Sequence, residues 1–358
     1  MTIGLPQIRI DFKEAIRRTT LKAGLGIVAI ILKDTQSTGV HEIFDLDDIP
    51  KQLNETNKTY LSYVLEGFGA KPSKVIAYVL NTEESEDIQL ALDYFEGTEF
   101  NIMTAPYEDN EGLVKVEAYI NKLCNLGVEV FGVLGAKTQK PTTENIIYVT
   151  FEDAKIGEKT LTSNELAVIV TGMIAGCPNP LSLTYATVPL ITEIPKLTKD
   201  TLNTRIGNGE IVLFKEAGEI RIARGVTSFT QNTEGKGYAY KKIKTVSTIK
   251  QIKNDIRLNL VKNYIGKVQN SYENKLLLIG VISEYLRELS ELQLIEANFD
   301  VQINLEAQKK YLKETLGQAV NDMTDQEILE ANTKDQVFIS IFLKLLDSIE
   351  NVDIVVNI

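Results

Sequence analysis

The chain has 358 residues, enough for two domains, and its 44% hydrophobic and 24% charged residues are usual for a folded globular protein, which excludes a disordered or fibrous one. Its net charge of −11 argues against nucleic acid as the main partner, because phosphate binding depends on clustered lysines and arginines. It has neither a run of about 20 apolar residues, as a membrane helix needs, nor the start of a signal peptide. We therefore expect folding in a cytoplasm and no membrane insertion.

The beginning of the chain alternates between apolar and polar side chains. Ile8, Ile10 and Phe12 are separated by single polar residues, so they would share one face of an extended strand. We assign residues 1–20 to an N-terminal arm built on this strand.

Residues 21–195 alternate between strand-like and helix-like patterns. Short apolar runs predict five buried strands, at residues 27–32, 75–80, 100–104, 128–134 and 146–151. Helical spacing separates them, at residues 60–68, 88–95, 114–126 and 164–175, and Ser163 is the expected cap of the last helix. This alternation predicts an α/β domain with a largely parallel sheet covered on both faces.

From residue 196 the pattern changes to α+β, in a second domain that we place at residues 196–345. A hairpin is expected from residues 209–214 and 219–229, with its turn at Ala217 and Gly218. Amphipathic helices follow, and in the second of them Leu276, Ile279, Ile282, Leu286 and Leu289 predict a core-facing stripe. The two amphipathic helices are expected at residues 249–264 and 272–292. The remaining predicted elements are a helix at residues 307–331 and strands at 299–305 and 337–343.

The last residues repeat the pattern of the first ones. Val352, Ile354, Val356 and Ile358 would share one face of a strand, which we assign to a C-terminal arm of residues 346–358. Chain ends are usually polar and frayed, so apolar alternation up to the final residue predicts a sheet that receives this strand.

Acidic and basic residues are concentrated in different stretches. Ten Asp or Glu and no Lys or Arg lie between Glu83 and Gly112, whereas ten Lys or Arg and two acids lie between Lys236 and Lys275. We predict complementary patches that meet between copies of the protein. Two other interpretations stay open: two solvated faces, and RNA binding on the basic stretch, which lacks an aromatic stacking platform. The candidate patch residues are Lys241, Lys242, Lys244, Glu83, Glu84, Glu86 and Asp87.

Catalytic motifs are absent from the sequence. His41 is the single histidine, without a second ligand at metal-binding spacing. Residues 132–138, GVLGAKT, resemble a phosphate loop but have two residues instead of four between the glycines, and Ala136 precedes Lys137. Carboxylates are plentiful, and no pattern singles out an acid and base pair. We therefore expect no catalytic, cofactor-binding or metal-binding residues, and no cofactor.

Five segments, taken together and in this order, form a distinctive set: GLPQIRIDF (4–12), GNGEIVLF (207–214), IARGVTSFT (222–230), KKIKTVSTIKQIKNDI (241–256) and IGKVQNSYENKLLLI (265–279). This set resembles phage tail sheath proteins, in particular those of Gram-positive phages and of phage-tail-like bacteriocins. The resemblance implies a non-enzymatic virion or tail-particle protein of a contractile tail or contractile injection system, assembled in the cytoplasm of a bacterial host.

The resemblance also implies how such a subunit works. It would polymerise in stacked hexameric rings around an inner tube protein, with baseplate and tail terminator proteins as further partners and no direct contact with nucleic acid. The extended polymer is metastable and contracts to drive the tube through a target envelope, as in viral genome ejection. The two terminal arms would reach into neighbouring subunits and extend a sheet there.

Two alternatives stay open. A cytosolic α/β enzyme with an unrecognised site would bind a small molecule and form an oligomer of defined size. Another tail component, such as the tube, is the second alternative, but tube proteins are usually shorter and built on one β-barrel, which disagrees with the alternation of strands and helices in residues 21–195.

Overall fold

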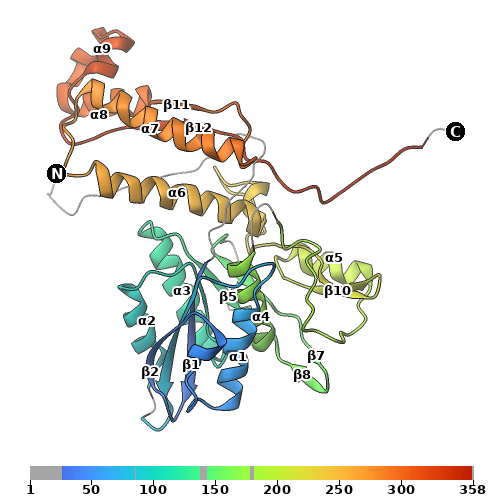
Figure 1. Cartoon of the computed structure of the whole chain (residues 1–358). Helices are drawn as coiled ribbons and strands as arrows, with labels where there is room; N and C mark the ends of the chain where they lie inside the picture. Colours follow the sequence, from blue (N-terminus) through green and yellow to red (C-terminus); the bar gives the residue numbers. More distant parts are fainter. Residues whose placement is uncertain (1–25, 85, 138–142, 178–180, 357–358) are drawn as a thin grey trace. The chain divides into compact units, whose positions relative to one another are not determined.

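The structure is a computed structural model that describes residues 26–84, 86–137, 143–177 and 181–356 (Figure 1). The described residues fall into two compact units. The large unit contains the residues up to Gln251 together with those from Ser348 onward, and the small unit contains Ile252–Asp347. These divisions differ from the domain boundaries expected after residues 195 and 345, which stay a prediction for the assembled protein.

A six-stranded sheet forms the centre of the large unit, with strand order β2-β3-β1-β4-β5-β6. Every neighbouring pair is parallel except β2 and β3, which are antiparallel. The predicted largely parallel sheet is therefore confirmed, with an antiparallel edge strand that carries His41 opposite Ala77. The strands are β1 (Ile27–Asp34), β2 (Gly39–Ile43), β3 (Lys74–Asn81), β4 (Ile102–Thr104), β5 (Phe131–Leu134) and β6 (Ile146–Tyr148).

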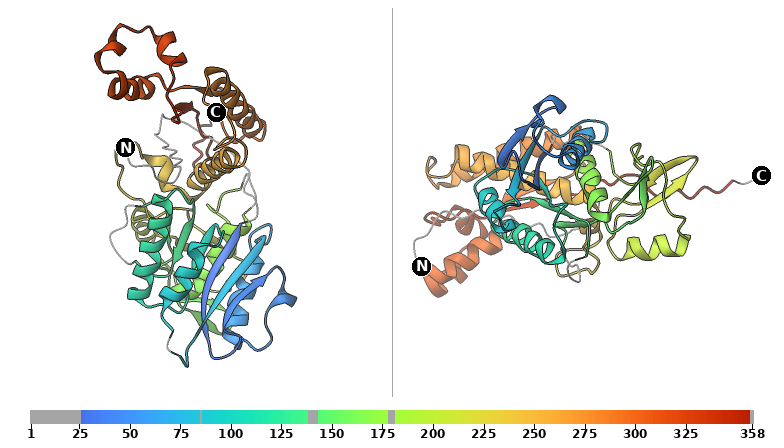
Figure 2. Two further views of the ribbon diagram at one scale, coloured as in Figure 1. Left: turned by 90° about the vertical axis from the view of Figure 1, so that its left-hand side faces the viewer. Right: turned by 90° about the horizontal axis from the view of Figure 1, so that it is seen from below.

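Helices cover both faces of this sheet, α2 and α3 on one side and α1 and α4 on the other (Figures 1 and 2). Strand β1 reflects this arrangement, because Val28 to Leu32 are all at most 1% exposed although their side chains point alternately to the two faces. The helices are α1 (Glu55–Glu66), α2 (Ile88–Glu96), α3 (Asn110–Asn125) and α4 (Ser163–Gly176), and a short 3-10 turn, η1 (Leu46–Asp48), precedes α1.

Each of these helices begins at a side chain that accepts a backbone N–H. Asn54, Asp87 and Asp109 do so for α1, α2 and α3. Helix α4 begins at Thr162, whose backbone is extended and whose hydroxyl group forms a capping box with Glu165. The predicted cap, Ser163, is wrong by one residue, because only Thr162 stands three residues before an acid that returns the bond.

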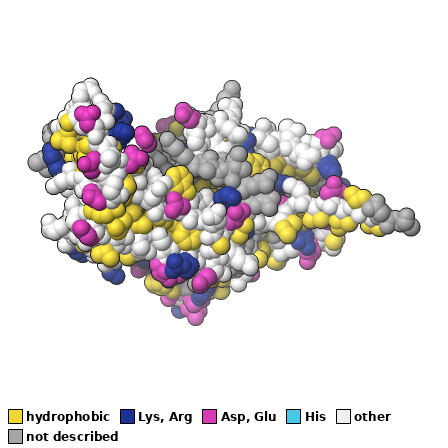
Figure 3. Space-filling view, turned by 90° about the horizontal axis from the view of Figure 1, so that it is seen from above, with side chains coloured by type: hydrophobic (Ala, Val, Ile, Leu, Met, Phe, Trp, Pro, Cys, Tyr) yellow, Lys and Arg dark blue, Asp and Glu magenta, His cyan; other side chains and the backbone are white. Residues whose placement is uncertain are grey.

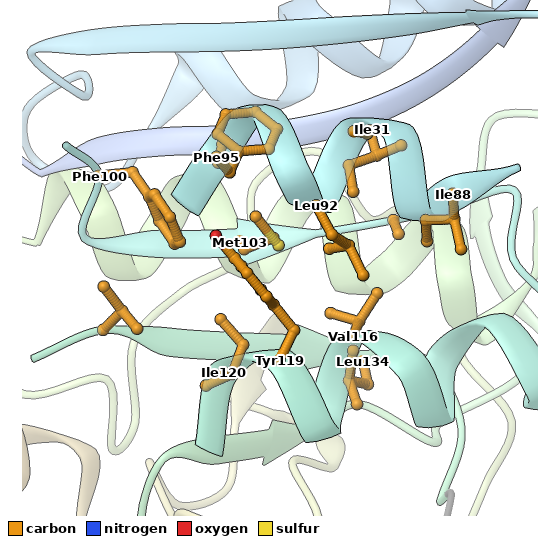
Figure 4. Packing of buried hydrophobic residues seen from close by; sticks show 14 of the residues in the cluster. Ile31, Ile88, Leu92, Phe95, Phe100, Met103, Val116, Tyr119, Ile120 and Leu134 are labelled. Carbon is orange, nitrogen blue, oxygen red and sulfur yellow. The ribbon is translucent and has the colours of Figure 1, made fainter. Parts of the chain in front are cut away.

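The core between the sheet and helices α2 and α3 consists of aliphatic and aromatic side chains. Leu92 and Phe95 of α2 and Val116 and Ile120 of α3 meet Met103 of the sheet (Figure 4). Helix α4 packs so tightly on α1 that a β-carbon on Gly172 would lie 2.4 Å from the Val64 carbonyl oxygen. A glycine is therefore required at this contact.

The rest of the large unit consists of two hairpins and short helices. The predicted hairpin is confirmed in a shorter form, with Ala217 and Gly218 both at positive φ in its turn. A second hairpin, β7 with β8, was not predicted. The elements are β7 (Ala154–Ile156), β8 (Lys159–Leu161), α5 (Lys199–Gly207), β9 (Leu213–Glu216), β10 (Glu219–Ile222), η2 (Tyr238–Lys241) and the start of α6 (Ile243–Asn263).

The small unit is α+β, as expected from the sequence. The stripe predicted for α7 is partly wrong: Ile282, Leu286 and Leu289 are buried, but Ile279 is only half-buried and Leu276 is 46% exposed. Leu278, which the prediction left out, is buried. The buried face includes the long side chain of Lys275 instead. The elements are the remainder of α6, α7 (Tyr272–Glu291), β11 (Asp300–Ile303), α8 (Leu305–Leu316), η3 (Gly317–Asp322), α9 (Asp325–Glu330) and β12 (Ile339–Phe342), and β11 pairs with β12 antiparallel.

Candidate interaction surfaces

The described part of the C-terminal arm exposes its apolar side chains. Val352, Ile354 and Val356 are 71%, 76% and 77% exposed, and residues 351–356 belong to no helix or strand. Hydrophobic side chains line this segment in the space-filling view (Figure 3). Val355 is exposed as well, so both faces of the arm are partly apolar. Ile358 and the N-terminal arm residues Ile8, Ile10 and Phe12 lie outside the described residues.

The root of this arm is held by charged side chains that are distant in sequence. The Glu350 side chain is 5% exposed and accepts from Arg224 at 3.0 Å and from Lys242 at 2.9 Å. Thr184 donates its hydroxyl group to the other carboxylate oxygen at 2.9 Å. We name Glu350, Arg224, Lys242 and Thr184 the arm-root cluster. Sequence reasoning missed it, because no local pattern connects Glu350 with residues more than a hundred positions away.

Neighbouring bonds extend the arm-root cluster on both sides. Arg224 donates from its second terminal nitrogen to the Asn351 side chain at 2.6 Å, and Lys244 donates to the Ser348 hydroxyl group at 2.7 Å. The side chains of residues 348, 350 and 351 are thus all bonded to residues of the large unit that come before α6 or at its start. The cluster also lines a cavity of about 310 Å³ beside α5, which Ile206, Phe229 and Tyr238 border.

The structure therefore gives the three candidate patch lysines different surroundings. Lys242 is buried, pairs with Glu350 and lies 5.2 Å from the centre of the Tyr238 ring. Lys244 bonds to Ser348, and Lys241 lines the cavity beside the arm-root cluster. Contact of these lysines with another copy stays a prediction, in which Lys242 already has a partner in its own chain.

The four acidic candidates follow β3 and lead into α2. Glu83 and Glu84 are exposed, and Glu86 accepts the Asn81 backbone N–H at 2.7 Å. Asp87 caps α2 and pairs with Lys115 at 3.0 Å. The bond from the Gln89 backbone N–H, together with that from Lys115, lowers the pKa of the Asp87 carboxyl group. All four belong to the large unit, and their contact with another copy also stays a prediction.

The loop that resembles a phosphate loop has a structural role. Lys137 donates to the buried Glu210 carboxylate at 2.6 Å, and Arg205 donates to the same carboxylate at 2.9 Å. A β-carbon on Gly135 would lie 2.1 Å from the Asn164 side-chain oxygen, so this glycine permits close packing against α4. These contacts engage Lys137 and Gly135 within the fold.

Open α/β sheets usually bind ligands at the carboxyl ends of their parallel strands, and at the end of β1 internal bonds occupy the polar side chain. Asp34 at the end of β1 accepts from Asn57 and from the backbone of Thr35, Gln36 and Asn54. His41 contacts the Ser37 carbonyl oxygen at 2.7 Å. Among the described residues, no three His, Cys, Asp or Glu side chains converge as metal ligands. The same described part of the chain contains no helix long and apolar enough to cross a bilayer.

Comparison with known proteins identifies the family. The model of the phage tail sheath protein central domain matches residues 81–228, and that of the phage tail sheath C-terminal domain matches residues 236–358. The tail sheath protein of Clostridium phage phiCD119 is 37% identical over 357 residues, which cover 98% of each chain.

Solved sheath structures share the fold. A sheath tail protein from Listeria innocua is similar with a TM-score of 0.67 and 16% identity, over 81% of this chain and 91% of that one. The sheath of the anti-feeding prophage in its contracted state gives a TM-score of 0.67 and 11% identity, over 99% of each chain. Both family models match the chain, and a relative that is 37% identical covers 98% of it. The chain therefore belongs to the phage tail sheath protein family.

Proposed function

We propose that this chain polymerises in stacked rings around an inner tube and shortens from a metastable extended state, which drives the tube through a target envelope. The exposed apolar C-terminal arm is the observation that carries the proposal. Contracted sheaths of similar fold support it, since those assemblies consist of many copies of one chain. A sheath of this kind needs no nucleotide, because the strain stored at assembly is the source of energy.

The arm is suited to adding a strand to another copy. Burying one apolar side chain contributes about 1.5 to 3 kcal/mol, and each backbone hydrogen bond about 1 kcal/mol. Ordering one residue costs about 1 to 2 kcal/mol, so the gain and the cost for Val352, Ile354 and Val356 are similar. The arm should therefore stay extended and unpaired in a monomer and become ordered only when it pairs with a sheet.

We further propose that the sheet of β11 and β12 receives an arm. Among the described residues these two strands pair only with each other, and a two-stranded sheet is marginally stable in water. Phe342 on β12 is 50% exposed and Val337 just before it is 43% exposed. An added strand would complete the backbone hydrogen bonds at an edge and cover these side chains.

The remaining parts of the proposal concern partners and chemistry. Residues 1–20 and 346–358 act as linking arms, and residues 21–195 and 196–345 form the body of the subunit. Tube, baseplate and terminator proteins are its partners, and assembly takes place in the host cytoplasm. The protein catalyses no reaction. The internal bonds of Asp34 at the end of β1 and the pairing of Lys137 with Glu210 support this last point.

Negative-stain electron microscopy of the purified chain tests the proposal. The full chain should form tubes, and a variant that ends after Asn351 should stay monomeric at the same concentration. Circular dichroism should show equal helix content in both, because the described part of the removed segment, residues 352–356, belongs to no helix or strand. Tubes formed by the truncated chain, or a full chain that remains a small oligomer of fixed size and binds a metabolite saturably, would contradict the proposal.

A further inference from the structure

We infer that the arm-root cluster fixes the point from which the C-terminal arm leaves its own subunit, and that tension on the arm enters the large unit through Glu350. The inference rests on the proposed function of the arm. It adds the residues that hold the arm on the subunit from which it comes.

Contacts with the rest of the large unit end at this point of the chain. The Glu350 side chain is 5% exposed, although Ile349 before it is 88% exposed, and Val352, two residues after Glu350, is 71% exposed. Asn351 lies between Glu350 and Val352 and is bound by Arg224. The free length of the arm therefore begins at residue 352, after the bonds of Ser348, Glu350 and Asn351.

Electrostatics explain why an acid is required at position 350. Lys242 and Lys244 flank the first residue of α6, where the positive end of the helix dipole disfavours cations. Arg224 adds a third positive charge, and the sequence contains no acid between Glu234 and Asp255. Glu350, from the far end of the chain, is the carboxylate that the arm-root cluster places among these cations.

The path of the chain determines where tension is transmitted. Going back from the arm, Glu350 and Ser348 are bound to the large unit before the chain reaches the small unit, which ends at Asp347. A neighbouring copy that holds residues 352–356 would therefore pull on Arg224 and Lys242 before it pulled on β12. The arm would couple neighbours to the large unit, although it follows the small unit in sequence.

Loss of the cluster should weaken polymerisation by freeing the root. Several more residues would then have to be ordered when the arm docks, at an entropic cost that preorganisation avoids in the native chain. We expect Glu350→Gln to raise the critical concentration for tube formation by at least about tenfold. The amide group of glutamine can keep the bond from Thr184 but lacks the charge that Arg224 and Lys242 require.

The matched control is Glu158→Gln, which makes the same change of net charge on an exposed residue of the large unit, in the turn between β7 and β8. Critical concentrations come from sedimentation and negative-stain imaging of both variants. Hydrogen exchange of residues 348–351 in the monomer is a second measurement, and it should be at least about tenfold faster in Glu350→Gln than in the control. If Glu350→Gln does not fold, Lys242→Met is measured instead. This variant removes one of the two cations that pair with Glu350, while Arg224 still pairs with the carboxylate and keeps it satisfied in the fold.

The outcomes separate this inference from the proposed function. Equal critical concentrations and equal exchange in Glu350→Gln and Glu158→Gln would overturn the inference, even if the chain truncated after Asn351 forms no tubes. Tubes formed by the truncated chain would refute the arm's role in polymerisation. In that case faster exchange in the Glu350→Gln monomer would still support the cluster as the anchor of the arm.

Discussion

Replacing Glu210 by glutamine should destabilise the large unit and change its dependence on pH. Glu210 is buried and accepts from Lys137 at 2.6 Å, from Arg205 at 2.9 Å and from the Thr150 hydroxyl group at 2.5 Å. Burial alone would raise its pKa, but the bonds from Lys137, Thr150 and Arg205 hold the pKa of Glu210 below its ordinary value. The carboxylate therefore stabilises the folded state in its charged form.

The size of the effect follows from what glutamine can retain. A hydrogen bond to a charged group contributes about 1.5 to 3 kcal/mol. The amide oxygen of glutamine can keep the bonds from Thr150 and Arg205, but without the attraction between opposite charges. The side chains of Lys137 and Arg205 are 35% and 23% exposed, so water can partly solvate them after the carboxylate is removed. We expect a loss of about 2 kcal/mol at pH 7, less than for a fully buried pair.

Urea unfolding followed by circular dichroism measures this loss, with an expected decrease in the midpoint of roughly 0.7 M for a unit of this size. Because the pKa of Glu210 is lower in the folded than in the unfolded chain, its contribution is present above the unfolded value, about 4.3, and is lost as pH falls through the folded value. Wild type and variant should therefore converge below about pH 4. A difference that stays constant or grows between pH 7 and pH 3 would refute the reasoning.

Two further predictions concern packing and surface charge. Gly172→Ala should lower the melting temperature by the equivalent of about 1 to 3 kcal/mol, because its methyl group would collide with the Val64 carbonyl of α1. Gly280→Ala, a glycine on α7 with open space around it, should raise it slightly, and equal shifts in the two variants would contradict the packing argument. Lys241→Glu should raise the critical concentration of tubes at 0.05 M salt but much less at 0.5 M, where screening is stronger. The exposed Lys51→Glu is its control, and an effect independent of salt would exclude a charged contact at Lys241.

The sheet could be predicted from the sequence because both of its faces are buried. Residues 27–32 and 75–80 are continuous apolar runs, as strands between two helical layers must be, and the structure confirms them as β1 and β3. Strand β2 is harder to predict, because it lies at the edge and carries His41 and Glu42 among its five residues. The hairpin of β7 and β8 is similar: each strand has three residues, too few to show a period.

Helix α7 shows where periodicity alone fails. The predicted stripe begins with Leu276 and Ile279, whereas the structure buries Lys275 and Leu278 in the first turns. Lys275 is 3% exposed, and its ammonium group donates to the Gln308 side chain at 3.3 Å and to the Ala331 carbonyl oxygen at 3.4 Å. A lysine on a buried face is invisible to a hydrophobic pattern, so the predicted stripe is displaced by one position at the start of the helix.

Charge along the sequence was a weaker guide than apolar alternation, and the arm-root cluster shows the physical reason. Apolar alternation is a local property of one strand, so it predicts a C-terminal arm without knowledge of the arm's surroundings, and that arm stays a prediction. A charge acts through whichever charges the fold brings within a few ångströms, and Lys242 and Glu350 meet although 107 residues separate them in sequence. Part of the basic stretch is thus neutralised inside its own subunit. A contact between copies that depends on salt must therefore arise from lysines that do not hold the arm, and Lys241 is the candidate among the three.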